Sequence, residues 1–398
     1  MDVAEYQQRL VKIQSALKSR GLDAIVVVKP EHVRYVTGFW GYSARPEYAM
    51  PRRLTAVVLP ASGAPTLIVP KLELYFAQRR TWLDDVRHHV EWAQPGEVFG
   101  GIALLERVLR EKGLLARRIG LELGFISAQL FKLLSAAFEK ATLDDASGIV
   151  EEIRMVKSPR EIDILRLGGR MAVQEYEAEA AAIRAGVREF EIAMRGRDEA
   201  LRLSAQAIDD EDAPVPVDHP VLDGAQIITS GPRLDMVHGI ASARALRDGD
   251  MVLLDFCRIP QAHGYRIGFA RNVALRKPTN EETERYEIVQ RAYRTAVAML
   301  RPGIAAEEPD LAARAILDNA GIGETFVHRT GRGVGLEGVE RPEIGAGDKT
   351  KLQPGMVVTI EPSIYYSGFA AHVEDTFLIT AQGAECLTEC PRDLRRVM

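Results

Sequence analysis

Two glutamates near the C-terminal end of the chain stand inside apolar segments. Glu361 follows the run MVVTI, and Glu374 interrupts the run HVEDTFLI. Both runs are typical of buried β-strands, and an ionised carboxylate is almost never buried without a cation, a hydrogen-bond donor or a metal beside it. Two such carboxylates on neighbouring strands therefore predict a shared partner and the floor of a functional site. The alternative is a hairpin whose solvated face carries both glutamates, which the two-residue alternation of a strand also permits.

A histidine accompanies the second glutamate. His372 lies two residues before Glu374. Because side chains two apart on a strand point to the same face, we expect His372 to contact the surroundings of Glu374 and to take part in substrate binding.

The elements that must position these side chains lie in residues 153–398. Residues 151–185 read as a long helical stretch with a helix start at Ser158 inside it, where a proline at the next position and Glu161 three residues later give the pattern of a capping box. Further helices are expected near residues 189–208, 281–300 and 306–320, and strands around QIITS, MVLLDFCRI, ARNVAL, VVTIEPSI and VEDTFLIT. This mixture predicts an α+β domain.

Residues 1–152 read as a separate, smaller domain. The apolar spacing predicts a helix over Tyr6–Ser19, and the buried-strand run AIVVV follows. Helices and strands then alternate to about residue 145, which predicts a compact α/β domain. An aromatic and arginine-rich loop after the first strand contains Trp40 and Tyr48. We expect this loop to complete a binding surface, although a packed surface loop is an equal alternative.

Composition bounds the compartment and the partners. The chain has 398 residues, 46% of them hydrophobic and 27% charged, with a net charge of -5. This balance without a basic tract argues against a nucleic-acid partner, and no apolar run approaches the roughly 18 residues of a membrane span. The N-terminal segment has no secretory signal pattern, and the three cysteines form no CxxC motif. We therefore expect a cytoplasmic protein without disulfides.

Four ordered segments carry a resemblance to a known family. RMVKSPREIDILR, LRDGDMVLLDFCRI, LQPGMVVTIEPSIY and HVEDTFLIT resemble segments of the pita-bread hydrolases, which include prolidase, aminopeptidase P, methionine aminopeptidase and creatinase. The segment YVTGF after a buried strand is similar to the N-terminal domain of creatinase and prolidase. The resemblance implies a C-terminal pita-bread domain preceded by a creatinase-type N-terminal domain.

The family's metal ligands are only partly present. The metallopeptidases of this family hold two metal ions with two aspartates, one histidine and two glutamates. Asp255, Glu361 and Glu374 match three of these ligands, but Gly268 stands at the second aspartate and Arg332 at the histidine. A guanidinium stays protonated and cannot ligate a cation. The resemblance together with this departure predicts that Arg332 replaces the metal charge by forming ion pairs with the carboxylates, so no metal and no cofactor are expected.

The resemblance adds further site residues. His238, on the loop before the first site strand, matches a family histidine and is our catalytic candidate together with Glu361 and Glu374. His328 matches a family histidine that contacts substrate. We expect His328, Arg332, Asp255, Arg271, His372, Trp40 and Tyr48 to bind substrate.

Three functions remain open at this stage. The leading hypothesis is a metal-independent hydrolase of a non-peptide carbon–nitrogen bond in a small amide, amidine or ureido compound, close in character to creatinase and the ectoine hydrolases, which work without metal. The second is an Xaa-Pro peptidase with a reduced metal site. The third is a catalytically inactive pita-bread binding protein. A small-molecule partner is expected in the first two.

The resemblance also implies an oligomer. Creatinase-like relatives pair so that the N-terminal domain of one subunit reaches the cleft of the other, and symmetric dimers are the commonest oligomers. We therefore expect a homodimer, with the loop Trp40–Arg53 as the contributing segment.

Overall fold

The computed structural model describes residues 2–42, 51–207, 226–256 and 260–397. These residues form two compact units that adjoin in sequence at Arg154 and Met155. Tyr48 lies outside the described residues. None of the described helices is both long and apolar enough to cross a membrane.

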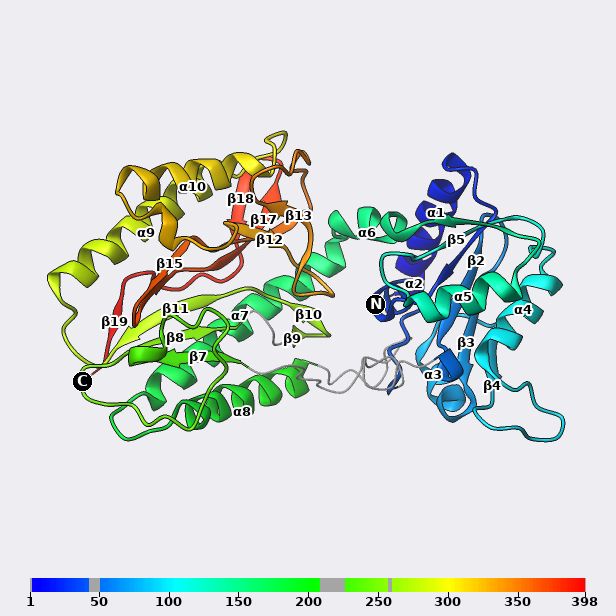
Figure 1. Ribbon diagram of the computed structural model, residues 1–398, viewed down its shortest axis with the longest axis horizontal. Helices are drawn as coiled ribbons and strands as arrows, with labels where there is room; N and C mark the ends of the chain where they lie inside the picture. Colours follow the sequence, from blue (N-terminus) through cyan, green and yellow to red (C-terminus); the bar gives the residue numbers. More distant parts are fainter. Residues whose placement is uncertain (1, 43–50, 208–225, 257–259, 398) are drawn as a thin grey trace. The chain divides into compact units, whose positions relative to one another are not determined.

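The N-terminal unit is built on a six-stranded sheet in the order β4-β3-β2-β1-β5-β6 (Figure 1). β1 runs antiparallel to β2 and parallel to β5, so the sheet is mixed. Its strands are β1 Ala24–Val27, β2 Ala56–Pro60, β3 Thr66–Pro70, β4 Val86–His89, β5 Arg118–Leu121 and β6 Thr142–Asp145. Its helices are α1 Val3–Ser19, α2 Pro30–Thr37, α3 Leu74–Arg80, α4 Gly101–Glu111, α5 Ala128–Ala137 and α6 Ser147–Met155, with short 3-10 turns at Pro51–Arg53 and Lys71–Glu73. Leucines of α4 pack against strand residues of β1, β2 and β5 to form the core of this unit.

The C-terminal unit holds four sheets. A four-stranded sheet has the order β19-β11-β8-β7, and a five-stranded sheet the order β13-β12-β14-β17-β18. The pairs β15-β16 and β9-β10 form two hairpins. The strands are β7 Ile227–Ser230, β8 Met251–Asp255, β9 Pro260–Ala262, β10 Tyr265–Arg266, β11 Ala270–Ala274, β12 Gly331–Gly333, β13 Glu340–Ile344, β14 Val357–Ile360, β15 Ser363–Tyr366, β16 Phe369–His372, β17 Asp375–Thr380, β18 Gly383–Cys386 and β19 Arg395–Arg396.

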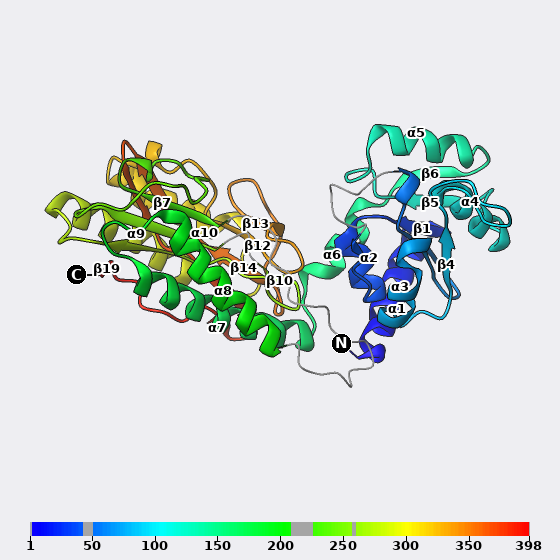
Figure 2. The same ribbon diagram turned by 90° about the horizontal axis from the view of Figure 1, so that it is seen from below.

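Two helix pairs cover these strands. α7 Pro159–Ala182 packs on α8 Glu189–Ala207, and α9 Asn280–Ala298 packs on α10 Glu307–Asn319. Figures 1 and 2 show the two pairs on opposite sides of the strands. The predicted capping box at Ser158 and Glu161 is confirmed: Ser158 accepts a hydrogen bond from the Glu161 backbone, and Glu161 accepts one from the Ser158 backbone. Short 3-10 turns lie at Gly231–Arg233 and Gly323–Thr325.

The two large sheets of this unit meet at Glu374. Its backbone N–H donates to the Ala270 carbonyl at 3.2 Å, and the Ala270 N–H donates back at 3.3 Å. Ala270 begins β11, and Glu374 directly precedes β17. The carboxylate of Glu374 is therefore held at the seam between two sheets. The predicted fold class, an α+β pita-bread domain after a smaller creatinase-type α/β domain, is confirmed.

Candidate functional site

Strands β14 and β17 place the two predicted glutamates opposite each other. Every residue of β14 is buried, and the antiparallel register pairs Ile360 with Asp375. Glu361 and Glu374 are the next residues beyond this pair, one on each strand. Glu361 is 9% exposed and Glu374 is fully buried. The apolar runs that predicted strands thus carry both carboxylates into the interior.

Arg332 comes to these carboxylates from β12. A Cβ at the preceding Gly331 would lie 1.9 Å from the Thr359 carbonyl oxygen, so only glycine allows β12 to pack this closely on β14. The Nη1 of Arg332 donates to Glu361 Oε1 and, at 3.2 Å, to Glu374 Oε1. Its Nε donates to the Gly338 carbonyl at 2.7 Å, which fixes the direction of the guanidinium.

Thr359 joins the same group. Its Oγ1 accepts a hydrogen bond from Arg332 Nη1 at 3.3 Å and donates to Glu361 Oε1 at 3.1 Å. Thr359 was not predicted as a site residue, although its position two residues before Glu361 on a strand puts both side chains on one face.

One arginine between two buried carboxyls drives their pKa values apart. Burial acts to raise the pKa of Glu361, but the charge and hydrogen bond of Arg332, together with contributions from His328 and His372, lower it below its usual value. Burial raises the pKa of Glu374 well above its usual range, and the negative charge of Glu361 raises it further. Without another cation, Glu361 is therefore the ionised member of the pair and Glu374 the protonated one.

His372 ends β16 beside Glu374. Its Nδ1 lies 3.0 Å from the Tyr365 hydroxyl, and burial lowers the pKa of His372 to about 3, so the imidazole is neutral. Its Nε2 is buried without a hydrogen-bond partner among the described residues, and so is Oε2 of Glu374. One donor atom from each of Glu361, His372 and Glu374 lies within 4.8 Å of the others.

His328 lies near His372, but both of its ring nitrogens already form hydrogen bonds. The two ring centroids are 6.0 Å apart. The Nδ1–H of His328 donates to the Arg329 carbonyl at 2.7 Å, which leaves Nε2 to accept from the Ser363 hydroxyl at 2.5 Å. Both ring nitrogens thus bond within the protein.

Asp255 and Gly268 complete the surroundings of Glu374. Asp255 ends β8, is 5% exposed, and its negative charge contributes to the raised pKa of Glu374. A Cβ at Gly268 would lie 2.2 Å from Glu374 Oε1 and 2.5 Å from Thr359 Cγ2. The carboxyl of Glu374 therefore occupies the space that a side chain at position 268 would need.

The residues present do not fit the pair of metal ions that the resemblance implies. Gly268 offers no donor atom and leaves no room for one, and Arg332 is a fixed cation bonded to both glutamates. Two dications need several bridging carboxylates to offset their mutual repulsion, and here a guanidinium already shares them. No step of the chemistry below depends on a metal pair.

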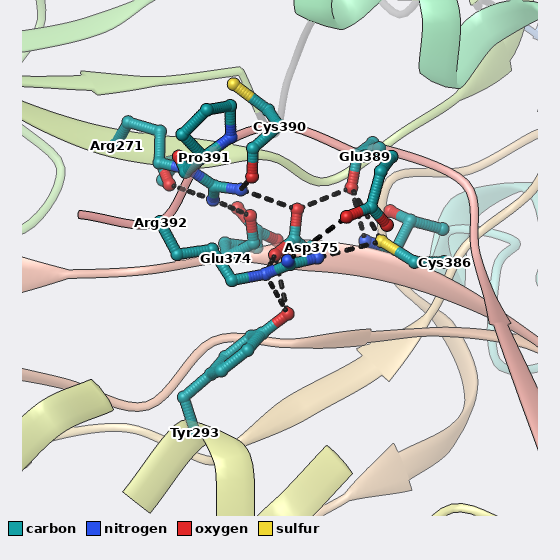
Figure 3. A network of polar contacts seen from close by, with 12 residues as sticks. Arg271, Tyr293, Glu374, Asp375, Cys386, Glu389, Cys390, Pro391 and Arg392 are labelled. Carbon is teal, nitrogen blue, oxygen red and sulfur yellow. Dashed lines mark hydrogen bonds and ion pairs between the residues drawn. The ribbon is translucent and has the colours of Figure 1, made fainter. Parts of the chain in front are cut away.

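Arg271 faces away from this group, into a second network. Its Nη2 donates to Asp375 Oδ1 at 2.8 Å and its Nη1 to the Glu374 carbonyl at 2.7 Å. Tyr293 and Arg392 bond the other oxygen of Asp375. Figure 3 shows Asp375 between these side chains, beside Glu374. Arg271 is 1% exposed, so its donors serve the protein interior.

His238 lies apart from the carboxylates and is exposed in the turn after β7. Ile240, two residues on, pairs with Ile227, which pairs in turn with Asp255, so this turn lies about two strand spacings, roughly 10 Å, across the ladder from Asp255. Trp40 belongs to the N-terminal unit, where its ring lies 5.5 Å from the guanidinium carbon of Arg34.

Comparison with known proteins gives the family context of this geometry. The sequence model of metallopeptidase family M24 matches residues 163–381, and that of the creatinase/prolidase N-terminal domain matches residues 9–156. The probable dipeptidase PepE of Mycobacterium tuberculosis is 33% identical over 99% of this chain and 97% of its own length. The Xaa-Pro dipeptidase of Pyrococcus furiosus is 29% identical over 98% of this chain and 99% of its own length.

Solved structures give the same result. Dipeptidase PepE from Mycobacterium ulcerans has a TM-score of 0.82 and 30% identity, and the match covers 100% of this chain and 99% of that one. An Xaa-Pro dipeptidase from Bacillus anthracis has a TM-score of 0.83 and 26% identity, over 98% of this chain and 100% of that one.

These findings correct the leading prediction from sequence. The proposed hydrolase of a non-peptide carbon–nitrogen bond, close to creatinase, is wrong, because relatives matching over the whole chain are dipeptidases. The prediction took the loss of two ligands at positions 268 and 332 as a sign of creatinase-like chemistry. Two changed positions carry less weight than similarity along both domains, and the peptidase alternative is better supported.

Proposed function

The chain belongs to metallopeptidase family M24, and from this premise we propose that it hydrolyses the peptide bond of dipeptides. The observation that carries the proposal is the 33% identity to a probable dipeptidase over 99% of the chain. Xaa-Pro dipeptidases are among the other relatives. Dipeptides ending in proline are therefore the first substrates to test.

The buried group supplies the charges that this reaction needs. Attack of water on a peptide carbonyl builds negative charge on the carbonyl oxygen, and a fixed cation in a water-poor site stabilises such charge. Arg332 is held in place by Gly338 and Thr359 and is 5% exposed. Glu361, ionised beside it, can accept a hydrogen bond from the attacking water and orient it.

The leaving amine must gain a proton. His238 is our candidate for this transfer, because histidine is the usual side chain for proton transfer at neutral pH and its turn pairs through Ile227 with the strand end that carries Asp255. Asp255 and His328 are proposed to contact the substrate. Arg271 has no place in this scheme, since its donors face Asp375.

A substrate panel tests the proposal. Purified protein is assayed with Xaa-Pro dipeptides, other dipeptides and small amides and ureido compounds, each with added Mn²⁺, with added Zn²⁺ and after chelation. We expect turnover of dipeptides that Glu361→Gln abolishes. Turnover of the non-peptide compounds with none of the dipeptides would refute the proposal.

We also propose that the protein is a homodimer in the cytoplasm, as the sequence predicts. Sedimentation at micromolar concentration checks the assembly. A fully active monomer would contradict it.

A further inference from the structure

Three donor groups of the site include two buried atoms that the described residues leave without a partner. These atoms are Nε2 of His372, which is 2% exposed, and Oε2 of Glu374, which is fully buried. Leaving a polar atom buried without a bond costs free energy. With Glu361, these two residues bring one donor atom each to within 4.8 Å of one another. We propose that Glu361, His372 and Glu374 bind a single divalent transition-metal ion, of the Mn²⁺ or Zn²⁺ class, next to Arg332.

The ligand types match this class of ion. An imidazole nitrogen with carboxylate oxygens suits zinc, manganese or iron rather than calcium or magnesium, which prefer oxygen ligands alone. Nε2 of His372, which has no partner among the described residues, offers a lone pair when the ring proton is on Nδ1.

Tyr365 can hold His372 in the tautomer that this role requires. A ligating histidine normally donates its other ring N–H to an outer partner, which fixes the ring orientation. The Tyr365 hydroxyl lies 3.0 Å from His372 Nδ1. With Nδ1–H donated to that oxygen, the lone pair of Nε2 is left for the metal. The backbone N–H of His372 donates to Asn272 Oδ1 at 2.8 Å, which holds the strand end in place.

Arg332 and one metal ion can share the same carboxylates. The guanidinium bonds Oε1 of Glu361 and Oε1 of Glu374, whereas the atom of Glu374 without a partner is Oε2. A carboxylate has lone pairs on both oxygens and can accept from a cation on one side and a metal on the other. Arg332 therefore leaves Oε2 of Glu374 available to the metal ion.

Charge limits the site to one ion. A metal ion bound at Glu374 displaces the proton of that carboxyl, so that Glu361, Glu374 and the nearby Asp255 then bring three negative charges. Arg332 supplies one positive charge, and one dication supplies the other two. A second dication would leave two positive charges in excess in a buried site, which Coulomb repulsion at short range opposes. In this chain Arg332 takes the place of a second metal ion, and His372 supplies the nitrogen ligand from a different strand.

The use of this ion in peptide hydrolysis rests on the proposed function, but its binding is measured without turnover. Metal-free wild-type protein is titrated with Mn²⁺ and with Zn²⁺ by calorimetry, and metal content is determined after dialysis. We expect one equivalent to bind. His372→Gln should weaken binding by at least the roughly 10- to 100-fold that loss of a ligand's outer partner costs. His328→Gln is the matched control, because both nitrogens of that nearby histidine already bond within the protein, and it should leave the affinity within about threefold of wild type.

Spectroscopy on the wild-type protein keeps the test independent of variant folding. Pulsed electron paramagnetic resonance of the Mn²⁺-loaded protein should detect one coordinated imidazole nitrogen, and Tyr365→Phe should weaken binding while leaving that signal in place. Absence of binding, binding of two equivalents, a missing nitrogen signal, or a folded His372→Gln with unchanged affinity would each overturn the inference. Dipeptide turnover without metal binding would overturn the single-ion inference and leave the proposed function standing. Metal binding without dipeptide turnover would support the inference and contradict the proposed function.

Discussion

Glu374 and Asp375 are adjacent, buried carboxyl residues with opposite surroundings. Asp375 accepts hydrogen bonds from four side chains: Arg271 and Thr388 on Oδ1, each at 2.8 Å, and Tyr293 and Arg392 on Oδ2, at 2.5 and 2.8 Å. Figure 3 shows Arg271, Tyr293 and Arg392 around Asp375. The side chain of Glu374, by contrast, accepts from Arg332 at 3.2 Å through one oxygen, and its second oxygen has no partner among the described residues.

The difference separates a structural carboxylate from a functional one. A buried charge whose lone pairs are all bonded has nothing to offer a ligand and serves to hold elements together. A buried carboxyl that keeps an unbonded oxygen is costly to the fold, and such cost is retained where a ligand or a reaction uses the atom. Both carboxyls accept a hydrogen bond from an arginine, but only the incompletely bonded one belongs to the site.

Removing the carboxyl of Glu374 should act on activity. Glu374→Gln keeps the shape but replaces a carboxyl that can gain or lose a proton with an amide that cannot, so dipeptide turnover should fall by about 10²- to 10⁴-fold, the range for a positioned acid, base or charge. Stability should change by less than about 1 kcal/mol, because Arg332 keeps Glu361 as its partner. Steady-state kinetics and urea unfolding measure the two quantities. A variant that is destabilised and still active would reverse the comparison.

Removing the charge of Asp375 should act on the fold instead. Asp375→Asn leaves Arg271, which is 1% exposed, buried without its counter-charge. Breaking one partner of a buried ion pair costs about 3–5 kcal/mol. The urea midpoint should fall accordingly. Glu389→Gln is the control, since Glu389 is 75% exposed where it meets Arg392, and such pairs contribute little.

The group around Glu374 could be predicted from the sequence, but the network around Asp375 could not. The apolar runs around Glu361 and Glu374 indicated strands carrying buried carboxylates, and the aligned segment GRGVGL indicated Arg332 as their partner. These inferences depend on local pattern and family alignment, which the sequence contains. Fold class and the capping box at Ser158 followed from the same local patterns.

The Asp375 network depends on contacts that no local pattern encodes. Its partners Arg271 and Tyr293 lie 104 and 82 residues away in sequence. Arg271 was grouped with the substrate-binding residues because an arginine can recognise a substrate carboxylate, but its donors face Asp375 instead. The unbonded atoms of His372 and Glu374 could not be predicted either, because the absence of a partner depends on how the whole domain packs around them.

Filling the space at Gly268 should disturb the site and the core together. In Gly268→Ala the added Cβ would lie 2.2 Å from Glu374 Oε1 and 2.5 Å from Thr359 Cγ2. Overpacking of this kind costs about 1–3 kcal/mol, and the displaced Glu374 should lower turnover and metal affinity as well. Calorimetric melting and metal titration follow both changes. A variant with wild-type stability and affinity would show that Glu374 does not depend on the space at position 268.

A pair of tyrosines tests the comparison with the same chemical change on each side. Tyr293→Phe removes the hydroxyl that donates to Asp375 Oδ2, and Tyr365→Phe removes the hydroxyl beside His372 Nδ1. Because Asp375 keeps three other donors, Tyr293→Phe should cost only about 1 kcal/mol of stability, near the usual value of one hydrogen bond, with no loss of metal affinity. Tyr365→Phe should change stability by no more than this amount yet weaken metal binding, since the ring of His372 loses its outer partner. If both variants lost stability and neither lost metal affinity, His372 would belong with Asp375 among the structural groups. If both lost metal affinity, the two faces of β17 would be coupled, and the separation drawn from Glu374 and Asp375 would fail.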